Sequence, residues 1–98
     1  MLAAMRRSEL TLHDDPAARR FEMDEQGQTS WADYRLSSGR LQILHVEAPL
    51  ALRGTGAAAR LMNAVAIHAR AQGLKVTPRC SYAAAWFARR PEFGDLLD

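Results

Sequence analysis

The sequence predicts an α+β fold, an antiparallel meander followed by a helix, a strand and a second helix. Two observations support this order. Between residues 20 and 47, apolar and polar side chains alternate in three runs separated by short polar turns, as in half-buried strands. From residue 58 onward, apolar side chains recur at helical spacing instead. The expected architecture is a mixed sheet with the helices packed on one face.

The three runs of the meander are bounded by residues that favour turns. Residues 20–24 precede a Glu-Gln-Gly-Gln turn, residues 29–36 precede Ser-Ser-Gly, and residues 41–47 end just before Pro49. Proline lacks the N–H that would continue a strand ladder. Because the connections are short, we expect neighbouring runs to pair antiparallel.

The second half of the chain has the pattern of two helices around one strand. Apolar positions at helical spacing are Ala58, Leu61, Met62, Val65, Ala66 and Ala69, and Gly73 is suited to end the helix. Residues 74–77 are expected to lie parallel beside residues 41–47, after a right-handed crossover. Ser81 is predicted to cap a second helix over residues 82–89, before Pro91.

Ninety-eight residues are enough for one domain, which we place at residues 10–98, with residues 1–9 as a frayed N-terminus. An apolar fraction of 48% and a charged fraction of 24% are ordinary for a soluble globular protein. No apolar run approaches the length of a membrane-spanning helix, and the first residues lack the order of a secretory signal. We therefore expect a cytoplasmic protein with no membrane partner.

The cysteine count and the charge bear on which structural sites and which partners the protein can have. The single cysteine, Cys80, excludes an internal disulfide framework and a zinc ribbon, and no metal site is predicted. A net charge of +2 without an aromatic–basic motif does not indicate nucleic-acid binding. Residues 1–49 carry −2 and residues 50–98 carry +4, which would attract a polyanionic ligand to the second half. A chance distribution of surface charge explains the asymmetry equally well.

The feature that most indicates a ligand-binding site is a glycine-rich turn between a strand and the long helix. It lies at residues 53–58 and reads Arg-Gly-Thr-Gly-Ala-Ala. Glycine permits left-handed backbone angles and close approach of a ligand. A helix N-terminus offers free N–H groups and the positive end of the helix dipole, which suit a pyrophosphate. Arg53 adds a permanent positive charge. A tight turn that binds nothing is the alternative explanation.

Two other nucleotide motifs fit less well. Residues 54–59 match G-x-G-x-x-A, but a dinucleotide fold has parallel strands before the turn and an acidic residue roughly twenty positions later. Here the meander is antiparallel, and residues 75–79 are Lys-Val-Thr-Pro-Arg. A Walker A loop requires Lys-Ser/Thr after its second glycine, where this chain has Ala57 and Ala58.

Four motifs then occur in order. They are His-Val-Glu-Ala-Pro at 45–49, Arg-Gly-Thr-Gly at 53–56, Pro-Arg-Cys-Ser-Tyr at 78–82 and Pro-Glu-Phe-Gly-Asp-Leu at 91–96. Arg53-x-x-Gly56-x-Ala58 resembles the acetyl-CoA pyrophosphate motif Q/R-x-x-G-x-G/A of the GNAT superfamily of N-acetyltransferases. The four motifs together, over about residues 10–97, resemble a small single-domain branch of that superfamily.

The sequence departs from this branch at two places. Relatives usually carry a threonine where this chain has Val46, a change that would remove a hydrogen bond near the thioester. They also tend to carry a histidine before the proline where this chain has Arg90 and Pro91. Neither departure affects the predicted phosphate-binding turn.

The resemblance implies a GNAT-like fold, acetyl-CoA as cofactor and an amine as acceptor. The implied cofactor-binding residues lie at the third strand's end, in the turn and in the cysteine motif: Val46, Glu47, Ala48, Arg53, Gly54, Thr55, Gly56, Ala57, Ala58 and Ser81. The predicted catalytic residues are Cys80, His45 and Tyr82.

The roles of these catalytic candidates stay open. Cys80 opens a helix, a position that favours a thiolate, so it can accept an acetyl group, protonate the leaving sulfur, or be structural. His45 and Glu47 share one strand face, and either can deprotonate an ammonium acceptor, although a histidine on an apolar strand is often a core residue. Tyr82 can donate to the leaving thiolate or simply pack against the long helix.

Two functions remain. The first is an N-acetyltransferase whose amine acceptor, a protein lysine, a peptide amine or a polyamine, the sequence does not identify. The second is a non-catalytic coenzyme A-binding or regulatory module, since the short chain is expected to lack the N-terminal helices that form an acceptor pocket in larger relatives. The sequence does not indicate an oligomeric state.

Overall fold

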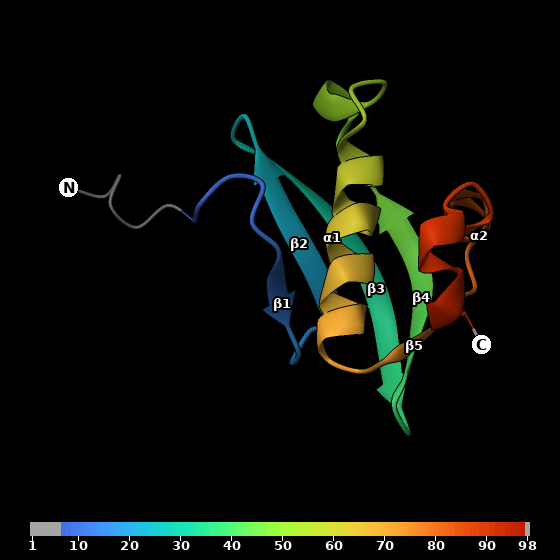
Figure 1. Cartoon of the computed structure of the whole chain (residues 1–98). Helices are drawn as coiled ribbons and strands as arrows, with labels where there is room; N and C mark the ends of the chain where they lie inside the picture. The colour runs from blue at the N-terminus through green and yellow to red at the C-terminus, as the bar shows by residue number, and fades with distance from the viewer. Residues whose placement is uncertain (1–6, 98) are drawn as a thin grey trace.

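A computed structural model describes residues 7–97, which form one five-stranded sheet in the order β1-β2-β3-β4-β5 (Figure 1). The first four strands pair antiparallel, and β4 pairs with β5 parallel. The strands are β1 (His13–Asp15), β2 (Arg20–Glu25), β3 (Gln28–Ser37), β4 (Arg40–Glu47) and β5 (Lys75–Pro78). The helices are η2 (Leu50–Leu52), α1 (Ala57–Ala71), α2 (Ser81–Ala88) and η3 (Pro91–Leu96), of which η2 and η3 are short 3-10 helices.

Both α-helices cover the same face of the sheet (Figure 1). The alternation of β2, β3 and β4 directs Phe21, Met23, Ala32, Tyr34, Leu41 and Ile43 into the core under them. The helices contribute Leu61, Met62, Val65, Ala66 and Ala69 from α1 and Ala83, Trp86 and Phe87 from α2. The predicted α+β architecture is confirmed, including the antiparallel meander, the parallel fifth strand and the one-sided helical layer.

The predicted strand boundaries differ from the observed ones by a single residue at several ends, whereas β1, η2 and η3 were not predicted. Strand β1 has the sequence His-Asp-Asp and no apolar alternation to reveal it. It is held by pairing with β2 and by the Tyr34 hydroxyl, which donates to Asp14 at 2.5 Å. The Tyr34–Asp14 bond joins residues twenty positions apart, so no local pattern encodes it.

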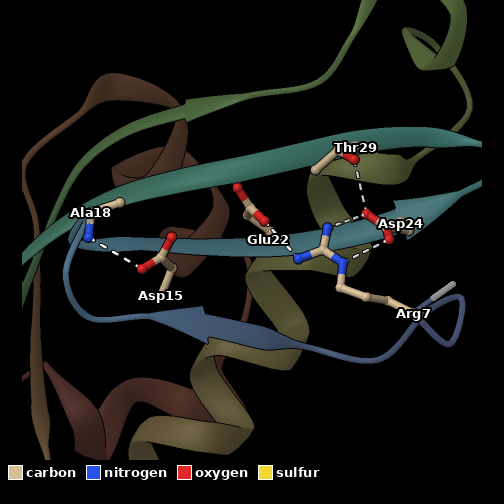
Figure 2. Close-up of polar contacts among 6 residues, drawn as sticks. All are labelled: Arg7, Asp15, Ala18, Glu22, Asp24 and Thr29. Carbon is tan, nitrogen blue, oxygen red and sulfur yellow. Dashed lines mark hydrogen bonds and ion pairs between the residues drawn. The ribbon is translucent and has the colours of Figure 1, made fainter. Parts of the chain in front are cut away.

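The face of the sheet opposite α1 is polar, and Figure 2 shows one end of it. Arg7 pairs there with Glu22 at 2.6 Å and with Asp24 at 2.5 Å, and Asp24 also accepts a bond from Thr29. Of the residues predicted to be frayed, 1–6 lie outside the described part of the chain. No helix between residues 7 and 97 covers this face.

Candidate functional site

A β-bulge in β4 determines which of its side chains reach the site. Asp33 of β3 pairs with His45, but the next residue, Tyr34, pairs with Ile43, so Leu44 is an extra residue in β4. After the bulge, Val46 packs against the core and His45 turns to the uncovered face, where its side chain is 55% exposed. The alternative of a core histidine is therefore wrong.

Strands β4 and β5 separate just beyond this point. Their pairing ends where Ile43 meets Pro78, and the carbonyl of Ile43 accepts from the N–H groups of Arg79 at 2.9 Å and Cys80 at 3.2 Å. The chain then turns into α2, while β4 continues to Glu47 alongside β3 alone. The backbone of β4 is therefore open on its β5 side near Val46.

The start of α1 presents unpaired N–H groups beside this opening. Gly54 and Gly56 have φ of +81° and +89°, left-handed values that favour glycine. Gly56 precedes the helix without a side-chain cap, and no acidic residue lies in the first turn. Because nothing neutralises the positive end of the dipole there, the turn suits an anion.

These elements enclose a cavity of about 310 Å³ between the end of β4, the turn and the first residues of α1. Its lining contains most of the predicted site residues: Val46, Glu47, Ala48, Arg53, Gly54, Gly56, Ala57, Ala58 and Tyr82. Leu52 and Ala59, which flank the predicted turn, also line it. Thr55, His45, Cys80 and Ser81 are not among the lining residues.

A larger cavity of about 570 Å³ lies on another flank of α1 and shares Gly56 and Ala59 with the first. Apart from Arg60 and Arg90, its lining is uncharged and includes Leu10, Met23, Asn63 and Ile67. It contains no side chain suited to be a nucleophile, a general base or a neutral proton donor. We therefore place the chemistry in the smaller cavity.

Glu47 contacts both His45, a predicted catalytic residue, and Arg53, a predicted cofactor-binding residue. Its carboxylate lies 2.9 Å from Nε2 of His45 and 2.7 Å from Nη2 of Arg53. Nε of Arg53 donates to the Ala48 carbonyl at 3.3 Å. The hydrogen bond from His45, and then that from Arg53, lowers the pKa of Glu47. The site thus holds an ionised carboxylate at neutral pH, paired with the arginine that was predicted to contact phosphate.

Cys80, Ser81 and Tyr82 have three different environments. The N-cap of α2 is Cys80, whose Sγ accepts from the N–H of Ala83 at 3.3 Å, so the prediction that Ser81 caps this helix is wrong. Cys80 is half-buried against the core, and Ser81 is exposed. Tyr82 borders the cavity, and burial raises its pKa even though Arg89 and Arg90 act to lower it. Its phenol is protonated at neutral pH.

Among residues 7–97, no three side chains of the types that bind metals lie together. Within the same residues, no helix combines the length and the hydropathy needed to cross a bilayer.

Comparison with known proteins identifies the family of this chain. Residues 20–96 match the model of the GCN5-related N-acetyltransferase family, and no curated protein matches the chain. The solution structure of a GCN5-like candidate N-acetyltransferase from Staphylococcus aureus is similar at a TM-score of 0.64 and 24% identity. The similarity covers 92% of this chain and 89% of that one and shows a shared fold. Because the family model spans most of the sequence, the chain belongs to the GCN5-related N-acetyltransferase family.

Proposed function

We propose that this chain binds acetyl-CoA in the cavity between β4 and α1 and transfers the acetyl group to an amine. The observation that carries the proposal is the uncapped start of α1, next to a cavity lined by nine residues that the sequence had assigned to the site. An uncapped helix N-terminus without nearby acids fits a pyrophosphate. The opened backbone of β4 near Val46 fits the amide groups of a pantetheine arm.

The residues around the cavity also fit the cofactor in shape. Ala57, Ala58 and Ala59 leave the approach to the helix free of long side chains. At Gly56, φ is +89° and an added Cβ would lie 2.9 Å from Nη1 of Arg60, so a side chain there would strain the backbone and displace the Arg60 guanidinium. Bound acetyl-CoA would supply an activated thioester as the acyl donor.

Two groups at the site can move the protons that the reaction requires. The carboxylate of Glu47, hydrogen-bonded to His45, can accept a proton from an ammonium acceptor and make its nitrogen nucleophilic. The protonated phenol of Tyr82 borders the same cavity and can donate to a leaving sulfur. We assign Glu47, together with the His45 bonded to it, as the general base and Tyr82 as the general acid.

The catalytic role predicted for Cys80 stays a prediction. Its Sγ is directed to the N–H of Ala83, and it does not line the cavity, which favours a structural role as helix cap. Ser81 likewise stays a predicted cofactor contact, outside the lining.

The open strand face beside the site bears on the class of acceptor. The strand face beside His45 and Glu47 is not covered by a helix in the described residues, which suits an extended acceptor such as a lysine-containing peptide or a polyamine. The same open face would also suit a coenzyme A-binding module without turnover.

Thermal unfolding tests the cofactor, because a ligand that binds only the folded state raises the Tm by mass action. We expect acetyl-CoA to raise it, and NAD and ATP at equal concentration to raise it far less. Stabilisation by NAD alone would contradict the proposal.

Release of free thiol, with a lysine peptide or a polyamine as acceptor, distinguishes a transferase from a binding module. An intact-mass spectrum after incubation with acetyl-CoA shows whether Cys80 is acetylated.

A further inference from the structure

A buried acidic side chain outside the cavity is connected to the glycine turn through one arginine. Glu25, the last residue of β2, has a side chain only 8% exposed. Both of its carboxylate oxygens accept bonds from Arg60 of α1, Oε1 from Nη2 at 2.7 Å and Oε2 from Nε at 3.2 Å. Such a two-pronged pair fixes the plane of a guanidinium as well as its position.

The remaining nitrogen of that guanidinium contacts the turn itself. Nη1 of Arg60 donates to the carbonyl of Thr55 at 3.0 Å, and it is the atom that a Cβ on Gly56 would meet at 2.9 Å. In a trans peptide the carbonyl of one residue and the N–H of the next point in opposite directions. Holding the Thr55 carbonyl toward Arg60 therefore turns the N–H of Gly56 away from it.

We propose that Glu25 and Arg60 are positioning residues that hold the peptide between Thr55 and Gly56 in the orientation that binds phosphate. The inference rests on the proposed function for its ligand. Neither residue lines the smaller cavity, so neither is assigned to direct contact with the cofactor.

The arrangement requires both members of the pair. The Arg60 side chain is 43% exposed and has several rotatable bonds, so without Glu25 its contact with Thr55 would compete with water. Glu25 removes that freedom because it is itself fixed on a strand, in the register that pairs it with Gln28. The end of the β2–β3 hairpin thereby determines the shape of a turn thirty residues later.

The first experiment measures how well the backbone N–H groups of the turn are protected from hydrogen exchange when no ligand is bound. Hydrogen exchange followed by mass spectrometry on the full chain should show faster exchange in residues 53–60 of Glu25→Gln and of Arg60→Gln. Exchange in the rest of α1 should be unchanged. Glu22→Gln is the matched control. It removes a carboxylate from the same strand, but this carboxylate pairs with Arg7 on the uncovered face of the sheet. Arg60→Lys keeps the charge and should restore part of the protection.

The second experiment measures binding of coenzyme A by calorimetric titration. Each of the two Gln variants should weaken it by about tenfold, since only the fraction of molecules with an oriented turn binds. The double variant should be no weaker than the single ones, because both act through one contact. Glu22→Gln should bind as the unmodified protein does.

Several results would overturn the proposal. Unchanged exchange in residues 53–60 would do so whether or not coenzyme A binds. Equal effects in Glu22→Gln would show a general loss of stability, and weaker binding in Arg60→Gln alone would make Arg60 a direct phosphate ligand. If Glu25→Gln does not fold, the two variants of the exposed Arg60 carry the test. If the unmodified protein does not bind coenzyme A, the proposed function fails, and the exchange measurement still decides the positioning role.

Discussion

Oε2 of Glu47 lies 2.7 Å from Nη2 of Arg53, so the arginine expected to contact phosphate is paired with the carboxylate at the end of β4. Both residues line the smaller cavity. A polyanion bound at the turn would compete with Glu47 for this guanidinium. The carboxylate would then remain bonded to His45 and be free to receive a cationic acceptor.

Replacing Glu47 with glutamine should therefore separate binding from catalysis. Loss of the acid frees Arg53 and removes a negative charge beside the ligand, so coenzyme A should bind up to about fivefold more tightly, the range of an exposed ion pair. The acetyl-transfer rate should fall by about a hundredfold or more if Glu47 contributes the base. Calorimetry and steady-state kinetics check the two parts. Weaker binding by Glu47→Gln would show that Arg53 depends on Glu47 for its position.

The pH dependence of Glu47 follows from its neighbours. Its pKa in the folded protein is lowered by His45 and then by Arg53. The pairing therefore stabilises the fold above the ordinary glutamate pKa of about 4.3 and loses this contribution as the pH falls toward the lower, folded value. Carboxyl-carbon NMR titration should show a midpoint below the ordinary value, and His45→Ala should raise it. A midpoint at or above the ordinary value would contradict the observed contacts.

Substitution of Gly56 by valine tests the turn. Its φ of +89° strains any side chain, and an added Cβ would displace Arg60, which it meets at 2.9 Å, so Gly56→Val should distort the turn and abolish coenzyme A binding. Gly27→Val is the matched control. Gly27 also has a positive φ, +74°, but an added Cβ would meet nothing within 4 Å, and it does not line the cavity. Both variants should lose about 1–2 kcal/mol of stability from backbone strain, yet only the first should lose binding. Unchanged affinity in folded Gly56→Val would move the cofactor elsewhere.

For Cys80, variants distinguish a helix cap from a catalytic thiol. Because Sγ accepts from Ala83, Cys80→Ala should lower the unfolding free energy by about 0.5–1 kcal/mol and Cys80→Ser should restore it. Coenzyme A affinity should be unchanged in both. The predicted catalytic role requires in addition a roughly hundredfold lower transfer rate in Cys80→Ala. Partial rescue of the rate by serine would indicate an acid and no rescue a covalent relay, whereas a full rate in Cys80→Ala would leave only the cap.

Two leucine-to-alanine substitutions test the packing of α1 against the sheet. Leu61 of α1 is 0% exposed under the sheet, whereas Leu50 of η2 is 80% exposed. Leu61→Ala should cost about 2–5 kcal/mol through lost burial and a residual cavity, and Leu50→Ala less than about 0.5 kcal/mol. Chemical denaturation measures both. Similar losses at the two positions would contradict the observed packing of α1.

Local patterns were enough to predict most of the fold. Alternation with period two in residues 20–47 and helical spacing after the turn depend only on neighbours along the chain, so they identify which face of each element is apolar. The glycine turn could be predicted in the same way, because its left-handed angles at Gly54 and Gly56 are a local property of the backbone.

The tertiary structure alone decided how those elements form a site. The extra residue Leu44 exists only relative to the register of β3, and it moves His45 out of the core and Val46 into it. The choice of Cys80 over Ser81 as cap depends on where β5 leaves β4, at the carbonyl of Ile43. The link from Glu25 through Arg60 to Thr55 spans thirty-five residues between its first two members. Such contacts arise when distant segments pack, and no periodicity within either segment records them.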